Sequence, residues 1–165
     1  MGLKPILRKV WAKRGQRPIT VVRPRYEWLY VYGFVRPETG ETSFWLTDSV
    51  NIETMTTILA AFVRERKRAT GADLDLVLDQ AGWHISDKLA VPEGLELFLL
   101  PAYSPELQPA EHLWSVLDEV VVNRVPVDLA EMECWVSRRC NELSDDKERV
   151  RRLTHFSWWP KLGVT

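Results

Sequence analysis

Alternating apolar and polar residues in the first third of the chain predict β-hairpins. Residues 25–35 are rich in aromatic and β-branched side chains, which is typical of a strand. Residues 37–40 supply a proline and a glycine for a turn, and residues 41–46 then predict the antiparallel partner. Upstream, residues 7–11 and 19–22 flank a Lys-Arg-Gly-Gln segment, which predicts a second and more basic hairpin.

The middle of the chain predicts a helix followed by two strands. Asn51 is suited to cap a helix that runs to about residue 68 with its apolar positions at helical spacing, and Gly71 ends it. Residues 74–78 and 95–100 are short apolar runs, which predict buried strands. One or two helical turns are expected between them, over residues 86–91.

The C-terminal third predicts helices. Ser104 and Pro105 have the signature of a helix start, although Pro109 allows the main helix to run freely only from about Ala110. Asp128, with Glu131 three residues later, forms a capping-box pattern that opens a last long helix. The predicted order is β-hairpins, helix, strand, short helix, strand, helices.

The composition favours one water-soluble domain. The chain has 165 residues, of which 45% are hydrophobic and 27% charged, so disordered, fibrous and large multidomain classes are excluded. No apolar run approaches the roughly 18 residues that span a bilayer, and none follows Met1. We therefore expect a cytoplasmic protein, with Cys134 and Cys140 reduced and with packing as the favoured role of both.

Positive charge is concentrated near the N-terminus. Residues 1–36 contain nine Lys or Arg and one acid, a balance of +8 in a chain whose net charge is −1. This asymmetry indicates an anionic partner, with nucleic acid favoured and a solvated basic strand pair as the alternative. The candidates for phosphate contact are Arg14, Arg17, Arg23 and Arg25, and no base-specific readout is predicted from them.

Two carboxylates occupy positions that suit catalysis. Asp79 directly follows the predicted strand 74–78, and strand ends of α/β sheets often present functional groups, although an Asp there also caps turns. Glu111 lies in the first turn of the helix that begins near Ala110, where a Glu is commonly only a partner of the helix dipole. Three prolines between residues 101 and 109 make the approach to Glu111 rigid, and paired carboxylates suit Mg²⁺ or Mn²⁺.

At these residues the chain resembles the catalytic domain of DDE transposases, in the bacterial insertion-sequence branch of the mariner-like superfamily. The resemblance rests on the Leu-Asp strand end followed by Gly-Trp-His at residues 82–84, on the Asp-to-Glu separation, and on the Pro-x-Tyr-Ser-Pro-Glu-Leu-x-Pro-x-Glu-x-x-Trp run at residues 101–114. It implies an α/β fold of the RNase H-like, retroviral-integrase-like type, in which a mixed sheet is flanked by helices. It also implies a single catalytic domain over residues 1–165.

The resemblance implies an Asp-Asp-Glu site around two Mg²⁺ or Mn²⁺ ions, with Asp79 as the second Asp and Glu111 as the Glu. One ion would activate a water or a 3′-hydroxyl, and the other would stabilise the leaving oxygen. For His84 two roles remain open. It would either orient DNA or a metal-bound water, or serve in packing. His112 stands where Asn is common in the family.

The chain departs from the family pattern at its N-terminus. Similar chains carry the first catalytic Asp just before the segment that is here residues 2–5, and this chain starts at Met1. We therefore expect the first strand and its Asp to be missing, together with the helix-turn-helix domain that usually recognises transposon ends. The missing strand would lie between strands 26–35 and 74–79, so residues 3–11 or a second chain are expected to cover the open edges.

The resulting hypothesis is the catalytic portion of a transposase, which cleaves and joins DNA at element ends but is inactive alone. It would act in the bacterial cytosol or nucleoid, as a homo-oligomer or paired with full-length transposase. One alternative is a truncated, non-catalytic protein that binds DNA or pairs with the transposase. Another is a different RNase H-like nuclease, which RNA or junction substrates would distinguish.

Overall fold

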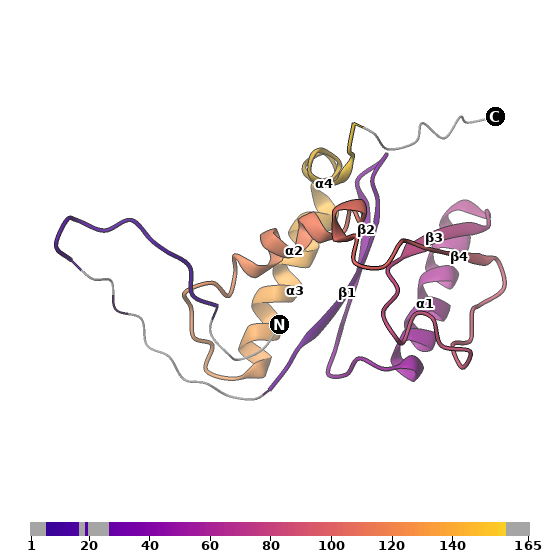
Figure 1. The fold of residues 1–165 in the computed structure, drawn as a ribbon, viewed down its shortest axis with the longest axis horizontal. Coiled ribbons are helices and arrows are strands. Elements are labelled where there is room, and N and C mark those ends of the chain that lie inside the picture. Colours follow the sequence, from indigo (N-terminus) through magenta and orange to yellow (C-terminus); the bar gives the residue numbers. More distant parts are fainter. Residues whose placement is uncertain (1–5, 17–18, 20–26, 158–165) are drawn as a thin grey trace. The chain divides into compact units, whose positions relative to one another are not determined.

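The computed structural model describes residues 6–16, 19 and 27–157. The chain divides into two compact units, one made of Met1–Asp48 with His112–Thr165 and the other of Ser49–Glu111. Figure 1 shows the elements, which are coloured along the chain. In chain order they are β1 (Tyr30–Arg36), β2 (Glu41–Thr47), α1 (Ile52–Thr70), β3 (Leu74–Leu78), β4 (Leu95–Leu99), the 3₁₀ helix η1 (Pro105–Leu107), α2 (Glu111–Asp118), α3 (Leu129–Asp145) and α4 (Lys147–Thr154).

The first unit contains the predicted antiparallel hairpin. β1 and β2 pair from Tyr30 opposite Thr47 to Arg36 opposite Glu41. The turn closes where the Gly40 N–H donates to the carbonyl of Arg36 at 2.8 Å, with Gly40 in the left-handed region at φ 73°. The strand begins later than predicted, because Trp28 makes only an isolated bridge and residues 20–26 lie outside the described part.

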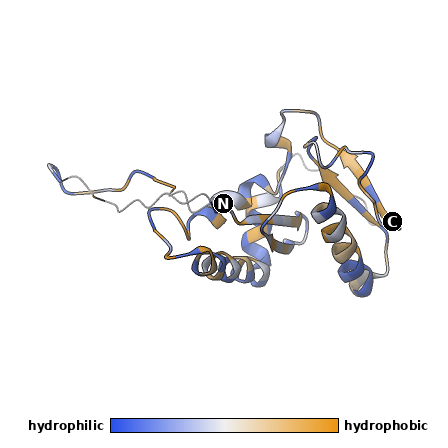
Figure 2. Ribbon diagram, turned by 90° about the horizontal axis from the view of Figure 1, so that it is seen from below, coloured by the Kyte–Doolittle hydropathy of each residue, from blue (hydrophilic) through white to orange (hydrophobic). Residues whose placement is uncertain are grey.

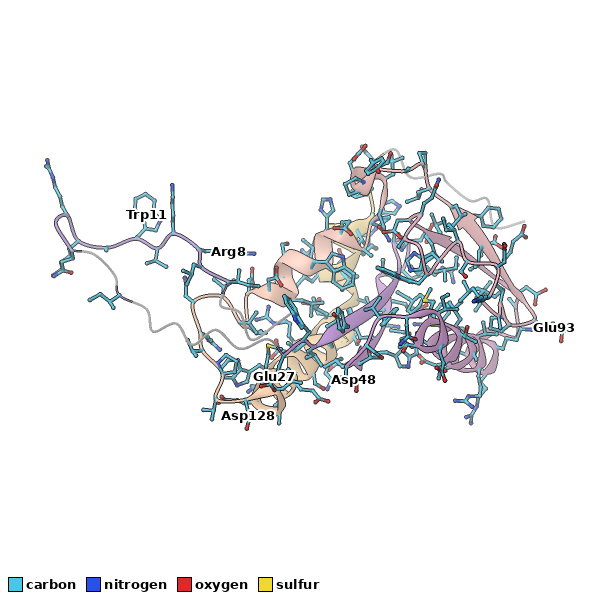
Figure 3. All side chains as sticks on the ribbon, turned by 60° about the horizontal axis from the view of Figure 1, so that its bottom comes forward. Arg8, Trp11, Glu27, Asp48, Glu93 and Asp128 are labelled. Atoms are coloured by element: carbon cyan, nitrogen blue, oxygen red, sulfur yellow. The ribbon has the colours of Figure 1, made fainter. Side chains whose placement is uncertain are left out.

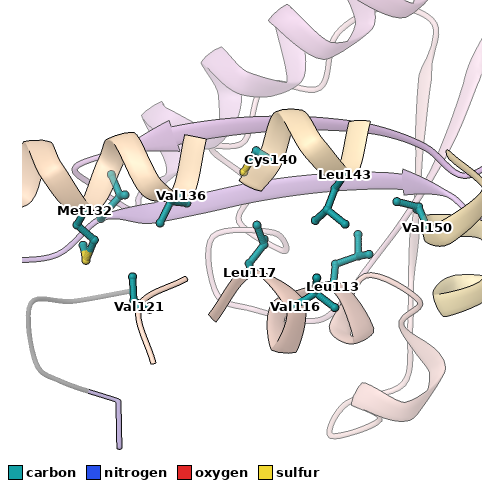
Figure 4. Close-up of a cluster of buried hydrophobic side chains, with 10 residues drawn as sticks. Leu113, Val116, Leu117, Val121, Met132, Val136, Cys140, Leu143 and Val150 are labelled. Carbon is teal, nitrogen blue, oxygen red and sulfur yellow. The ribbon is translucent and has the colours of Figure 1, made fainter. Parts of the chain in front are cut away.

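The core of this unit lies between the hairpin and the helices. Apolar side chains of α2 and α3 meet over the strands, and Val150 of α4 joins them (Figure 4). The predicted core face of the long helix is confirmed, since its buried residues recur at helical spacing. These are Met132, Val136, Cys140 and Leu143.

The predicted N-cap at Asp128 forms at the start of α3, but the Glu131 carboxylate binds the N–H of Val127 instead of that of Asp128. A second cap separates α3 from α4. Asp128 Oδ1 accepts from the N–H of Glu131 at 2.9 Å, while Glu131 Oε2 accepts from the N–H of Val127 at 2.6 Å. After α3, Asp146 leaves the helical conformation and accepts from the N–H of Arg149 at 3.0 Å. That local bond starts α4, a helix that apolar spacing alone does not predict.

The second unit pairs α1 with a parallel strand pair. Asn51 Oδ1 accepts from the N–H of Thr54 at 2.8 Å, and Gly71 ends α1 at φ 70°, as predicted. β3 and β4 run parallel from Leu74 opposite Leu95 to Leu78 opposite Leu99. The strands are mostly hydrophobic, whereas α1 carries both kinds of residue (Figure 2). Its buried residues are Met55, Ile58, Leu59, Phe62 and Val63.

The mixed α/β class is confirmed, because one strand pair is antiparallel, the other parallel, and helices accompany both. The described strands form two separate two-stranded sheets. Residues 7–11 form no strand, so the prediction of a strand there is wrong, and residues 20–22 of the expected partner lie outside the described part. Residues 86–91 form a turn, in which the Leu89 N–H donates to the Ser86 carbonyl at 2.9 Å, and no helix.

Within the described part of the chain, every helix is too short or too polar to cross a membrane.

Candidate functional site

Asp79 stands at the carboxyl end of the parallel strand pair. The Leu100 N–H donates to the carbonyl of Leu78 at 2.8 Å, so the pairing of β3 with β4 continues up to the residue before Asp79. Gln80 Nε2 donates to the carbonyl of Leu100 at 2.9 Å on the other side of Asp79. Asp79 is therefore held from both sides by the backbone of the β4 end. Such strand ends present side chains to ligands in α/β folds.

The carboxylate of Asp79 is oriented by His84. Nδ1 of His84 lies 2.6 Å from Oδ1 of Asp79 and 3.2 Å from its carbonyl oxygen. Because both partners are acceptors, Nδ1 carries a proton and donates it. Oδ1 also accepts from the N–H of Ala81 at 3.2 Å, so the turn-capping role considered for Asp79 is real as well.

The second oxygen of Asp79 has a different environment. Among the described residues no donor binds Oδ2, and the Asp79 side chain is 52% exposed. The His84 side chain is only 12% exposed, and its ring meets Trp83 edge to face at a centroid distance of 5.7 Å. The arrangement thus fixes one carboxylate oxygen through a largely buried imidazole, whereas no described donor holds the other oxygen of this half-exposed side chain.

Glu111 is placed by the proline-rich segment before it. Pro105 begins the short helix η1 rather than a full helix, and Ser104 makes no side-chain cap bond there. Tyr103 adopts a φ of 59°, and the N–H of Glu111 donates to the carbonyl of Gln108 at 3.1 Å. α2 then begins at Glu111, close to the predicted start at Ala110. Glu111 is exposed and belongs to the same compact unit as Asp79.

The donor chemistry of these acids fits a divalent cation of the Mg²⁺ type, which prefers carboxylate oxygens. The Asp79 side chain is half exposed, and Glu111 is an exposed acid of the same unit. In the described ranges, however, no group of three or more His, Cys, Asp or Glu gathers in the geometry of a metal site. These two acids therefore supply the right donor type, and they are the two of the three family acids that the resemblance assigned to this chain.

The other predicted residues fall elsewhere. His112 belongs to the other unit, where its ring meets that of Phe156 edge to face at 4.9 Å. Arg14 is exposed in the turn that the Gln16 N–H closes by donating to the Lys13 carbonyl at 3.0 Å. The three other arginines proposed for DNA contact lie outside the described residues. These are Arg17, Arg23 and Arg25.

Sequence reasoning missed the contact between His84 and Asp79, although it named both residues. The spacing of five positions corresponds to no regular helix or strand contact. It arises from a turn in which the N–H of His84 donates to the carbonyl of Ala81 at 2.8 Å. The Gly-Trp-His segment after the strand was the sequence feature that could have indicated this contact.

Comparison with known proteins places this chain in a family. Residues 1–132 match the family model described as DDE superfamily endonuclease. An uncharacterized protein, y4pE/y4sA, of Sinorhizobium fredii is 33% identical over 132 residues, which cover 79% of this chain and 96% of that protein. No solved structure matches the chain. Because the family match includes the strand end at Asp79 and the helix start at Glu111, as well as most of the remaining chain, this protein belongs to the DDE superfamily endonucleases.

Proposed function

We propose that the chain is the catalytic portion of a transposase of the mariner-like, insertion-sequence type, which cleaves DNA strands and joins them at element ends. The observation that carries this proposal is the half-exposed Asp79 carboxylate at the end of β3, with one oxygen held by His84. It lies within the stretch that matches the endonuclease family. In this proposal residues 1–165 form a single catalytic domain whose partners are DNA and a second transposase chain, in the bacterial cytoplasm.

The proposed roles follow from the surroundings of each side chain. Asp79 and Glu111 hold Mg²⁺ or Mn²⁺ through carboxylate oxygens. Of two divalent ions at such a site, one would activate a water or a 3′-hydroxyl and the other would stabilise the leaving oxygen in phosphoryl displacement. His84 acts as a positioning residue, because its 2.6 Å bond fixes the direction in which Asp79 presents its other oxygen.

The 165-residue chain is proposed to have little activity by itself. The family site uses three acids, and Asp79 and Glu111 are the two that the motifs assign to this sequence. Two carboxylates hold a divalent ion more weakly than three, since each ligand contributes to the affinity. The third carboxylate would come from another segment or another chain.

A nicking assay tests this proposal. Supercoiled DNA carrying element ends is incubated with the isolated chain and Mg²⁺ or Mn²⁺, next to the Asp79→Asn variant. We expect both proteins to stay near background. Robust nicking that disappears in Asp79→Asn would show that the chain is complete, and equal nicking by both proteins would remove Asp79 from the reaction.

The exposed cationic segment at residues 6–16 favours a second candidate function. In this alternative the chain is a non-catalytic protein that binds DNA or pairs with a full-length transposase. It predicts salt-sensitive DNA binding or hetero-oligomer formation without cleavage, and neither property would respond to Asp79→Asn. Metal binding that depends on Asp79 separates the two candidates, because only the catalytic one requires it.

A further inference from the structure

Residues 6–16 form an extended arm of the first unit, on which Trp11 is fully exposed. The relative exposure of the Trp11 side chain is 104%, and every residue from Leu7 to Gln16 is exposed. The arm leads away from the helices of its own unit, with Arg8 near its root and Trp11 farther out (Figures 1 and 3). An exposed Trp has no packing role, so its large apolar surface is available to a ligand.

The root of the arm is fixed by Asn123. The Arg8 N–H donates to Asn123 Oδ1 at 3.0 Å, and Asn123 Nδ2 donates back to the Arg8 carbonyl at 3.2 Å. The Asn123 N–H also donates to the Ile6 carbonyl at 3.0 Å, and the Ile6 side chain packs against the core. Trp11 lies three residues beyond Arg8, so it stands within about 10 Å of this anchor.

The charge of the arm identifies the class of ligand. Arg8, Lys9, Lys13 and Arg14 are its charged residues, and there is no acid between residues 6 and 16. Lys9 and Lys13 each lie two positions from Trp11. Cations that flank an exposed aromatic ring suit single-stranded nucleic acid, in which phosphates alternate with bases that can stack.

We propose that Trp11 stacks on an unpaired base of DNA, while Lys9, Lys13 and Arg14 contact the neighbouring phosphates and Asn123 fixes the arm to its unit. This inference rests on the proposed function, in which DNA ends are opened and cut. Stacking needs an accessible base face, so the arm binds single-stranded DNA and frayed ends in preference to intact duplex. Because every base has such a face, the contact is independent of sequence.

Fluorescence anisotropy with the full chain tests the role of Trp11. The probes are a labelled single strand, a blunt duplex and a duplex with an unpaired end. Trp11→Ala should weaken binding to the single strand and the unpaired end by about tenfold, since base stacking on an aromatic ring is worth roughly 1–3 kcal/mol. Trp11→Phe should keep most of the affinity, and Val127→Ala, which removes an exposed apolar group outside the arm, should change nothing.

The cations are tested separately. Replacing Lys9, Lys13 and Arg14 by Ala should weaken binding to all three probes and lower the salt slope on duplex DNA by about 2 to 3, because three phosphate contacts are lost. Circular dichroism should show unchanged folding, since these side chains are exposed.

Each outcome has a defined meaning. Wild-type affinity of Trp11→Ala for the single strand would overturn the stacking role, and so would a loss of self-association with DNA binding intact. If the wild-type chain binds none of the probes, both the arm and the proposed function are wrong. If it binds them but is indifferent to Trp11→Ala, only the arm inference is wrong.

Discussion

The two oxygens of the Asp79 carboxylate are in different situations. Oδ1 receives donors from His84 and Ala81, whereas the Asp79 side chain as a whole is half exposed. A carboxylate held in this way can present its free oxygen to a ligand in one direction. In the proposed metal site, the side chain that holds Asp79 would therefore contribute to metal binding by setting the orientation of the carboxylate.

This gives a prediction for His84. His84→Ala removes the 2.6 Å bond and should weaken Mn²⁺ binding by about tenfold, as expected for a residue that orients a ligand. His84→Asn should keep most of the affinity, because its side-chain amide can donate from nearly the position of Nδ1. Titration calorimetry with Mn²⁺ measures both, with the exposed His155→Ala as control. Equal affinities for the wild type and His84→Ala would contradict the positioning role.

The two cysteines should differ in reactivity. Burial raises the pKa of the Cys140 thiol from 9.0 to about 11, and Cys134 is exposed. At pH 8 a disulfide reagent should therefore modify Cys134 in the native protein, and both thiols only after unfolding. Rapid native modification of Cys140 would contradict the packing of α3.

The same burial links Cys140 to stability at alkaline pH. The folded state retains the Cys140 proton up to a higher pH than the unfolded state does. Its contribution is therefore complete below about pH 9 and is lost as the pH rises toward 11, with an upper size of roughly 2–3 kcal/mol. Denaturant titrations at several pH values should show this component in the wild type and not in Cys140→Ala.

Among individual residues, the sequence identified Asp79 and Glu111 through the motifs around them. It did not predict the partner of Asp79, because that contact depends on the exact path of the turn between residues 79 and 84. It favoured packing for both cysteines, which the structure confirms for the buried Cys140 and contradicts for the exposed Cys134. Trp11 had no assigned role, since exposure of a Trp is the exception and apolar character alone argues for burial.

Among the elements, the β1–β2 turn is constrained by both conformation and space. Gly40 has a φ of 73°, and a Cβ on it would collide with the backbone carbonyl of Lys147 in α4. Gly71 has nearly the same conformation, with φ at 70°, but no atom within 4 Å of the added Cβ. The pair separates the cost of the left-handed conformation from the cost of the collision.

Gly71→Ala should reduce the free energy of unfolding by about 1–2 kcal/mol through conformation alone. Gly40→Ala should reduce it by a further 1–3 kcal/mol, because backbone atoms of α4 must move to make room. Urea denaturation of both variants measures the difference. Equal losses would show that the hairpin turn and α4 are not packed together as described.

Elements with strong local signals were predicted well, and those that depend on tertiary partners were not. The cap at Asn51 and the turn glycine Gly40 act within a few residues, so their elements follow from sequence. Residues 7–11 have strand-like composition, but a strand requires a paired neighbour, and these residues instead follow the anchor at Asn123. α4 begins because Asp146 bonds locally, which apolar spacing cannot reveal.

At the level of the whole molecule, part of the excess of positive charge near the N-terminus can be assigned to a defined segment. The cations near the N-terminus include those of an exposed arm, and the two proposed metal ligands lie in the other compact unit. The α/β class and the family were predictable because long motifs carry them. The coordination geometry was not predictable, since it depends on how acids that are far apart in the sequence are brought together.

Iron-mediated cleavage tests whether Asp79 and Glu111 share a divalent ion, as proposed. Fe²⁺ that replaces Mg²⁺ generates radicals in the presence of ascorbate and peroxide, which cut the backbone beside the bound metal. We predict fragments that end near residues 79 and 111, suppressed by excess Mn²⁺ and lost in both Asp79→Asn and Glu111→Gln. They should persist in Glu93→Gln, which changes an exposed acid of the same unit. Cleavage at other positions, or cleavage unchanged by Asp79→Asn, would show that Asp79 and Glu111 do not share a metal ion.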